Sequence, residues 1–199
     1  MMAAKPNAPS AERNKEAILE VLIDELRDRK TILEIGSGTG QHAIFFASEM
    51  PWLSWQTSDR IENHDGITAW LDDAKLDNVH APLQLHVLEP VQFSDKFDAV
   101  FSANTAHIMS IAAVQCMFRI VSERLNDGGK FCLYGPFNQN GNFSSDSNRD
   151  FDMNLKSQDP VMGIRDLEKL DEFAAANGMR RESLYAMPAN NMIAVWQKN

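Results

Sequence analysis

The strongest constraint on the fold is a glycine-rich turn between a strand-like segment and a helical one. Residues 31–35 are a short apolar run typical of a buried strand, and residues 36–40 read Gly-Ser-Gly-Thr-Gly. Residues 41–49 then have the pattern of a helix, which Pro51 stops. Glycines in a strand–turn–helix unit allow a ligand to approach the backbone and the helix N-terminus. The sequence therefore predicts a ligand site at this turn.

Strand-like and helical segments continue to alternate along the chain. Further strands are predicted at residues 53–58, 83–88, 97–102 and 130–134. Two more, at residues 181–187 and 192–196, are separated by the short turn Pro-Ala-Asn-Asn, so one of the two should be antiparallel. Helical patterns lie between the earlier strands. This alternation is typical of an α/β fold with a mostly parallel sheet and helices on both faces.

The chain is expected to fold as a single domain over residues 1–199. Its 199 residues are 44% hydrophobic, which suffices for one core. Residues 1–9 are expected to be a flexible N-terminus, and residues 10–28 an amphipathic N-terminal helix. Residues 135–163 have only scattered apolar side chains, so a long loop is predicted there. Loops of this length are usually functional or disordered, and this one is a candidate lid.

The composition argues against several classes of partner. Lys and Arg number 19 and Asp and Glu 28, which gives a formal net charge of −9, and no long basic run is present. A nucleic-acid partner is therefore not expected. Cys116 and Cys132 lack the spacing of a zinc site or a disulfide framework, and no metal site is expected. No membrane-spanning or leader segment is recognised, so a cytoplasmic location is expected, while the oligomeric state is left open.

The spacing of the glycines favours one class of cofactor over another. Dinucleotide-binding loops follow G-x-G-x-x-G, which requires a third glycine at position 41, where the chain has Gln41. The observed G-x-G-x-G is the form found in S-adenosyl-L-methionine loops. That cofactor has no phosphate and carries an ammonium and a sulfonium, which an acidic neighbour favours. The predicted cofactor-binding residues at this turn are Glu34, Gly36, Ser37, Gly38 and Gly40.

Residues at the ends of later strands predict the rest of the cofactor site. Asp59 ends the second strand, 19 residues beyond Gly40 (59 − 40), where a carboxylate can accept hydrogen bonds from ribose hydroxyls. Both cofactor classes use such an acid, so Asp59 does not choose between them. His86 and Val87, at the third strand, are predicted to contact the adenine, with a core-packing role as the alternative for His86. Asn104, after the fourth strand, is assigned to the same site.

The segment after the fourth strand limits the choice of methyl acceptor. Residues 102–107 lack the Asn/Asp-Pro-Pro-aromatic element of enzymes that methylate amino groups of bases, and the paired glutamates of enzymes that methylate arginine. His107 is a candidate general base, because an unperturbed imidazole titrates near neutral pH; a packing or capping histidine is the alternative. Tyr134 is a second candidate, also with a packing alternative. A base is not required, because the sulfonium is already activated and alignment can supply much of the acceleration.

Short motifs over nearly the whole chain carry a resemblance to a known family. They include Gly-Thr-Gly-Gln-His-Ala at 38–43, Trp-Gln-Thr-Ser-Asp at 55–59, Asn-Thr-Ala-His at 104–107, Tyr-Gly-Pro-Phe at 134–137 and Gly-Ile-Arg-Asp at 163–166. With these motifs the sequence resembles the class I S-adenosyl-L-methionine-dependent methyltransferases, and among them the methyltransferase-like protein 26 family. The resemblance implies a Rossmann-like, seven-stranded sheet whose last strand is antiparallel. It implies no substrate, and His86 stands where that family often has Asp.

The N-terminal helix and the predicted loop are expected to enclose the site. Arg13 and Asn14 open the helix, and Asn148 and Asp152 lie in the loop at residues 135–163. As a lid, these segments would keep water from the sulfonium and offer polar contacts to the substrate. The alternatives are local capping by Asn148 and Asp152, and a surface ion pair for Arg13.

Together these features predict a methyltransferase that transfers a methyl group in line from the sulfonium to a small or medium-sized acceptor. A non-catalytic binding module or partner subunit with the same fold is the alternative. An NAD-dependent oxidoreductase is disfavoured, because Gln41 occupies the position of the third glycine.

Overall fold

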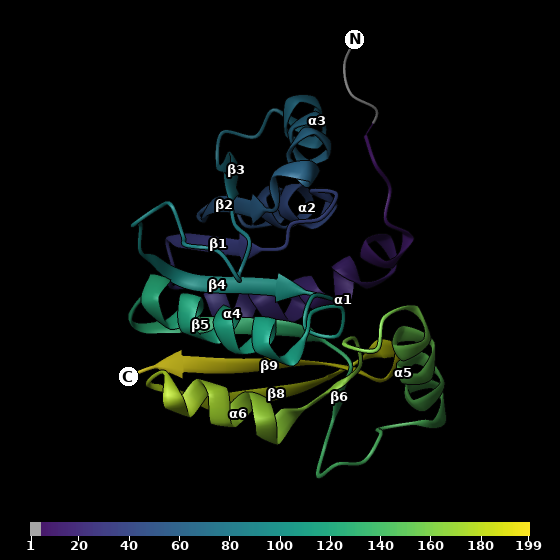
Figure 1. Cartoon of the computed structure of the whole chain (residues 1–199). Coiled ribbons are helices and arrows are strands. Elements are labelled where there is room, and N and C mark those ends of the chain that lie inside the picture. Colours follow the sequence, from purple (N-terminus) through teal and green to yellow (C-terminus); the bar gives the residue numbers. More distant parts are fainter. Residues whose placement is uncertain (1–4) are drawn as a thin grey trace.

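The computed structural model describes residues 5–199, which form one seven-stranded sheet with helices around it (Figure 1). The strands, in spatial order, are β3 (Val79–Gln84), β2 (Ser54–Asp59), β1 (Thr31–Ile35), β4 (Phe97–Ala103), β5 (Leu125–Gly135), β9 (Asn191–Lys198) and β8 (Met179–Met187). Neighbours are parallel except at β9, which is antiparallel to both β5 and β8. The predicted fold class, a mostly parallel sheet with the last strand antiparallel, is confirmed.

Helices cover both faces of this sheet. The helices α1 (Pro9–Leu26) and α2 (Gln41–Glu49) pack on one face, and α4 (Ile111–Arg124) and α6 (Leu167–Ala176) pack on the other (Figure 1). The helix α3 (His64–Ala74) packs against α2 and β3. Side chains alternate along a strand, so Ile32 enters the core under α1 and α2, while Leu33 enters the core under α4 and α6.

A further helix and a small second sheet lie near the carboxyl ends of the parallel strands (Figure 1). β6 (Phe137–Asn138) pairs with β7 (Arg165–Asp166), and α5 (Asp146–Gln158) lies between them in the chain. The prediction of a long loop over residues 135–163 is therefore wrong for the parts that form β6 and α5. The buried residues of α5 are Asn148, Asp152 and Leu155. Because two of these three are polar, the helix lacks the apolar periodicity by which sequence patterns are recognised.

The third strand lies earlier in the chain than the sequence predicts. The prediction is residues 83–88, whereas β3 is Val79–Gln84 and contains Pro82. Proline lacks the N–H that an interior strand needs, but β3 is an edge strand, where the sheet tolerates this loss. His86 and Val87 consequently follow the strand instead of lying within it.

The segment before α1 is held against α3. Lys5 Nζ lies 2.5 Å from Asp73 Oδ2, and Trp70 Nε1 donates to Pro6 O at 2.8 Å. A flexible N-terminus was expected for residues 1–9; residues 1–4 of that stretch lie outside the described residues. The helix α1 itself spans Pro9–Leu26, close to the expected helix at residues 10–28.

Candidate cofactor site at the carboxyl end of the sheet

The backbone of the glycine turn is open to a ligand at its centre. Gly36, Gly38 and Gly40 have φ values of 75°, 58° and 91°, in the left-handed region that side chains disfavour. A Cβ at Gly36 would lie 2.6 Å from Thr105 Cγ2, and one at Gly40 would lie 3.2 Å from Ile67 Cα. At Gly38, no atom of the described chain beyond its two neighbours lies within 4 Å of that position. The turn is therefore packed at its ends and accessible in the middle.

Glu34 supports this turn from inside the protein. Its carboxylate is buried and accepts hydrogen bonds from Ser37 Oγ at 2.8 Å and Trp55 Nε1 at 3.2 Å. Ser37 Oγ in turn accepts from Ser58 N at 3.2 Å. Burial raises the pKa of Glu34 to about 7, although these two hydrogen bonds act to lower it. The negative charge of Asp59 also raises this pKa. A positively charged ligand at the turn would favour ionisation of this carboxyl group.

The structure brings Asp59 into contact with the glycine turn. Its Oδ2 accepts a hydrogen bond from Gly38 N at 2.7 Å. Its Oδ1 accepts from Arg60 N at 2.7 Å and from Asn63 Nδ2 at 2.8 Å. A carboxylate offers about four acceptor positions. Asp59 is thus fixed at the end of β2 with acceptor capacity left for a ligand hydroxyl.

His86 and Val87 lie beside Asp59, beyond the end of β3. Leu85 N donates to Asp59 O at 2.9 Å, which ties this segment to the turn. Val87 packs against the core under α4 and α6. His86 Nδ1 is buried and has no hydrogen-bond partner among the described residues, with Glu89 Oε1 3.8 Å away. The contact of His86 with an adenine stays a prediction.

The end of β4 adjoins the glycine turn and contains an unusual backbone conformation. Asn104 has a φ of 59°, in a region that non-glycine residues adopt rarely and often at functional sites. Its N–H donates to Tyr134 O at 2.9 Å, which joins the ends of β4 and β5. Thr105, whose side chain faces Gly36, shares a 2.7 Å hydrogen bond with Ser102 Oγ. The predicted residues Asn104 and Tyr134 are thereby brought to the same edge as the turn.

The helix α1 brings Asn14 to this edge as well. His42 Nε2 and Asn14 Oδ1 are 2.7 Å apart, and the nitrogen must donate because an amide oxygen only accepts. Burial lowers the pKa of His42 to about 4, although a backbone hydrogen bond and the charge of Glu12 both act to raise it. Burial raises the pKa of Tyr134, and a hydrogen bond from Asn14 opposes that rise. Asn14 therefore links α1 to α2 and β5, whereas Arg13 is exposed, with no ion pair within residues 5–199.

The chain matches one protein family over nearly its whole length. A family described as "Protein of unknown function (DUF938)" matches residues 5–198. The chain belongs to this family. A release factor glutamine methyltransferase of Aliivibrio fischeri is 34% identical over 90 residues, which are 44% of this chain and 31% of that protein.

Solved methyltransferase structures resemble this DUF938 chain in fold. An O-methyltransferase family protein from Burkholderia thailandensis has a TM-score of 0.77 at 11% identity, over 93% of this chain and 59% of that one. The S-adenosylmethionine-dependent methyltransferase SibL has a TM-score of 0.80 at 14% identity, over 95% and 55%. CalO1, a methyltransferase in calicheamicin biosynthesis in its SAH-bound form, has 0.73 at 15% identity, over 92% and 54%. The DUF938 chain has a Rossmann-like methyltransferase fold and spans just over half the length of these chains.

His107 follows β4 in this DUF938 chain and is covered by α5. Its ring packs edge to face on Phe151, with centroids 5.3 Å apart, and its carbonyl accepts from Gly163 N at 2.9 Å. Burial lowers the pKa of His107 to about 4, and the positive charge of Arg165 adds to this effect. The near-neutral pKa that makes histidine a good general base is therefore not retained here. At neutral pH His107 is an uncharged ring that can accept a hydrogen bond.

Polar side chains hold α5 in place over this segment. Asp152 accepts from Ile164 N at 2.8 Å and from Lys156 Nζ at 2.6 Å. Asn148 donates through Nδ2 to Asn190 O at 3.0 Å. Both side chains are buried. Asp152 caps backbone of the same segment at Ile164, in line with the capping alternative, whereas Asn148 reaches a residue 42 positions away. These contacts fix the position of the helix that covers His107.

Gln41 is a residue of this site that the sequence indicated only as a missing glycine. Gln41 is 4% exposed, and its side chain makes four hydrogen bonds. Its Oε1 accepts from Ala8 N at 2.6 Å and Thr39 Oγ1 at 3.0 Å. Its Nε2 donates to Asn7 Oδ1 at 3.1 Å and Glu12 Oε1 at 2.7 Å. A polar residue at the first position of α2, next to the turn, was the available signal.

Arg165 is a second residue that sequence patterns did not single out as part of the site. Its Nε donates to Ala106 O at 3.0 Å, and its Nη2 donates to Val161 O at 2.8 Å and to Met109 O. In the sequence, Arg165 stands out only as part of the Gly-Ile-Arg-Asp motif at residues 163–166. The guanidinium is engaged by backbone carbonyls, so it shapes the segment after His107 and lowers the pKa of that ring.

Three further features of the described residues concern metal ligands, helix hydropathy and cysteines. Within residues 5–199, no three His, Cys, Asp or Glu side chains are grouped as a metal site. No helix in that range is long and apolar enough to cross a membrane. Cys116 and Cys132 are both free, and burial raises the pKa of the Cys132 thiol to about 12.

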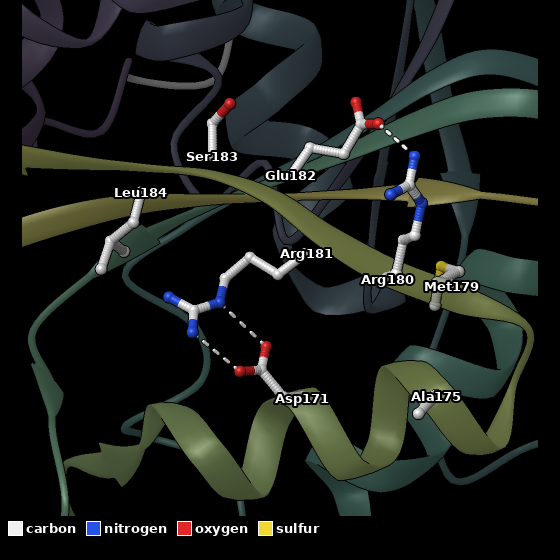
Figure 2. A pocket seen from close by; sticks show the side chains of 8 residues that line it. All are labelled: Asp171, Ala175, Met179, Arg180, Arg181, Glu182, Ser183 and Leu184. Atoms are coloured by element: carbon white, nitrogen blue, oxygen red, sulfur yellow. Dashed lines mark hydrogen bonds and ion pairs between the residues drawn. The ribbon is translucent and has the colours of Figure 1, made fainter.

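A hollow of about 440 Å³ lies away from the glycine turn, between α6 and β8. Figure 2 shows Arg181 extending from β8 toward Asp171 on α6, with Nη2–Oδ2 and Nε–Oδ1 distances of 2.9 and 3.1 Å. Arg180 and Glu182 form a second ion pair on its rim, at 3.1 Å. None of the predicted site residues lines this hollow, and its charged groups are already paired.

Proposed function

We propose that this protein is an S-adenosyl-L-methionine-dependent methyltransferase that acts on a small or medium-sized acceptor. The observation that carries this proposal is the acidic surroundings of an open glycine turn. Glu34 supports the turn from within, and Asp59 accepts a hydrogen bond from Gly38 at its centre. The carboxyl group of Glu34 behind the turn disfavours a pyrophosphate and favours a ligand end that carries a sulfonium and an ammonium, whereas Asp59 suits the ribose of either cofactor class. The methyltransferase fold supports the same choice.

The residues at this edge fit such a cofactor. Gly36, Gly38 and Gly40 would admit its methionine end, with Glu34 and Ser37 holding the turn. Asp59 has acceptor capacity for the ribose hydroxyls. The other proposed contacts, to the adenine and along the end of β4, come from His86, Val87 and Asn104. When bound, the cofactor supplies an activated methyl group.

The acceptor would lie between the ends of β4 and β5 and the helices α1 and α5. His107, neutral at pH 7, would accept a hydrogen bond from the acceptor, and Tyr134 would help to position it. Arg13 and Asn14 would provide polar contacts from α1. The helix α5, held by Asn148 and Asp152, would exclude water from the reacting atoms. Alignment of the acceptor with the methyl group would supply much of the acceleration, so the low pKa of His107 is compatible with transfer.

Calorimetry with three ligands tests this proposal. We expect S-adenosylmethionine and S-adenosylhomocysteine to bind and NAD to bind poorly. Binding of NAD without S-adenosylhomocysteine would contradict the proposal and favour an oxidoreductase. The acidic net charge of −9 favours a small acceptor over nucleic acid, and a cytoplasmic location remains part of the proposal.

A non-catalytic binding module is the second candidate, because His107 is a weak base in this fold. The two candidates differ in turnover. We expect labelled methyl groups to be transferred to at least one member of a library of metabolites and short peptides. A protein that binds S-adenosylhomocysteine yet transfers no methyl group across such a library would favour the module.

A further inference from the structure

Gln41 joins the first turn of α2 to the segment at the start of α1. All four hydrogen-bonding positions of its amide are used, by Asn7, Ala8, Glu12 and Thr39. A buried amide with every position satisfied is a rigid connection, because breaking any one bond leaves a polar atom without a partner. Asn7, Ala8 and Glu12 are therefore held against the first residue of α2, beside the glycine turn.

The same contact brings a carboxylate to the N-terminus of α2. Hydrogen bonds from Lys15 and Gln41 lower the pKa of Glu12, so this group is ionised at neutral pH. Lys15 Nζ pairs with Glu12 Oε2 at 2.5 Å, and His42, the next residue of α2, is neutral. A negative charge near the N-terminus of a helix interacts favourably with its dipole. The chain thus places a carboxylate of its own, paired with Lys15, at this helix end.

In dinucleotide-binding folds, the N-terminus of the helix after the first strand holds the pyrophosphate. Here the side chain of Gln41, the first residue of α2, is hydrogen-bonded to Asn7, Ala8 and Glu12, which brings residues 7–12 to this helix end. We propose that Gln41 is a specificity-determining residue, which excludes diphosphate-bearing cofactors from the glycine turn by holding residues 7–12 across the N-terminus of α2. This inference deepens the proposed function and rests on it for the identity of the preferred ligand.

S-adenosylhomocysteine and ADP form a matched pair of probes for this proposal. Both contain adenosine, and they differ in whether a homocysteine or a diphosphate is attached to it. The quantity to measure is the ratio of their dissociation constants by calorimetry. Unmodified protein should bind S-adenosylhomocysteine much more tightly than ADP, and adenosine alone should report the shared part of the interaction.

Variants at Gln41 should change this ratio. Gln41→Ala removes the four hydrogen bonds, and Gln41→Gly also restores the glycine spacing of dinucleotide loops. In both variants the dissociation constant for ADP, divided by that for S-adenosylhomocysteine, should fall about ten-fold. ADP gains access to the helix N-terminus, and S-adenosylhomocysteine loses the ordered residues beside its site. Glu12→Gln keeps an acceptor for Gln41 but removes the charge, and should narrow the ratio about three-fold, since Glu12 is partly exposed to solvent. Gln92→Ala, at an exposed glutamine elsewhere, should leave it unchanged.

Hydrogen exchange of residues 5–14 provides a readout that does not depend on the ligand. Exchange there should accelerate in both Gln41 variants and stay slow in Gln92→Ala. Unchanged exchange would overturn the claim that Gln41 holds the segment. Faster exchange with an unchanged ratio would overturn the claim about specificity. If the unmodified protein failed to bind S-adenosylhomocysteine, the proposed function would fall, while a gain of ADP binding in the variants would still support exclusion by Gln41.

Discussion

Two buried glutamates at opposite ends of the sheet differ in their partners. Glu25, toward the amino ends of the strands, lies 2.6 Å from Lys130 Nζ and accepts a hydrogen bond from Tyr185 Oη at 2.5 Å. Burial alone would raise its pKa, but these hydrogen bonds outweigh burial and lower it. Glu34, at the carboxyl end of β1, has only the neutral donors Ser37 and Trp55, and its pKa rises to about 7.

The difference separates a structural group from a candidate functional one. The charge of Glu25 is balanced within the protein, so it needs nothing from outside. Glu34 is kept partly protonated in an environment that a cationic ligand would change, which is characteristic of functional sites. The same end of the sheet holds Asn104 in a left-handed conformation. Unbalanced charge and the left-handed backbone of Asn104 thus coincide at the edge of the sheet where we propose the ligand site.

The largest expected effect is at the structural end. Glu25→Ala leaves Lys130 without its partner in a poorly solvated place and should reduce the free energy of unfolding by about 3 kcal/mol. Urea denaturation measures this, with Glu20→Ala, an exposed position on the same helix, as the control. Affinity of the folded variant for S-adenosylhomocysteine should not change. A large loss of affinity would mean that the two ends are not independent.

Glu34→Gln should act on stability in the opposite direction. The pKa of Glu34 is about 7 when folded and 4.5 as a free group, so its contribution to stability falls as pH rises from 4.5 to 7 and is level above 7. Removing the charge should increase stability at pH 8 by up to about 3 kcal/mol and abolish that pH dependence. Denaturation at pH 5 and pH 8 measures both. If the free energy of unfolding changed with pH equally in the variant and the unmodified protein, Glu34 would be ionised over the whole range from pH 5 to pH 8.

Asp59→Ala tests the ligand side of the comparison. Loss of hydrogen bonds to a charged acceptor should weaken S-adenosylhomocysteine binding by about 1–3 kcal/mol. Gly38 N and Asn63 Nδ2 would also lose their partner, so the folded fraction must be checked by circular dichroism. Asp95→Ala, at an exposed aspartate, is the control. Equal affinities for Asp59→Ala and the unmodified protein would remove Asp59 from the site.

Sequence patterns identified the parts of the fold that depend on local periodicity. The glycine turn and the place of Asp59 at the same edge follow from the sequence because the carboxyl ends of parallel strands share one edge, whereas the hydrogen bond from Gly38 to Asp59 was not predicted. Two elements depended on the whole fold. Pro82 is acceptable in β3 only because that strand is at an edge. The helix α5 buries Asn148 and Asp152, so its inner side does not have an apolar pattern.

The environment of the candidate site was harder to predict than its residues. The low pKa of His107 depends on burial by Phe151 and on Arg165, which is 58 positions later in the chain (165 − 107). The role of Gln41 depends on Asn7 and Ala8, which reach it only after α1 has docked on α2. Such effects follow from tertiary packing, which no short motif records. The assignment to the methyltransferase-like protein 26 family stays a prediction.

A smaller effect is expected from the backbone strain at Asn104. Asn104→Ala should cost about 1 kcal/mol of stability, because alanine lacks the polar side chain that helps asparagine adopt a left-handed conformation. Asn104→Gly should be neutral or slightly stabilising. Lys75, left-handed at the end of α3 and far from the turn, allows a matched comparison through Lys75→Gly. If the Asn104 variants changed ligand affinity and Lys75→Gly did not, the left-handed backbone at Asn104 would be part of the ligand site. Equal stability of Asn104→Ala and Asn104→Gly would contradict the role of strain.

The smallest effect should come from the hollow between α6 and β8 (Figure 2). The ion pair of Arg181 with Asp171 is partly exposed, so screening by water limits its contribution. Arg181→Ala should lower the free energy of unfolding by about 0.5 kcal/mol, and it retains the hydrogen bond from Trp196 Nε1 to Asp171. Affinity for S-adenosylhomocysteine should stay the same, because this hollow has paired, exposed charges instead of a buried, unbalanced one. A changed affinity would contradict the assignment of the ligand site to the glycine turn alone.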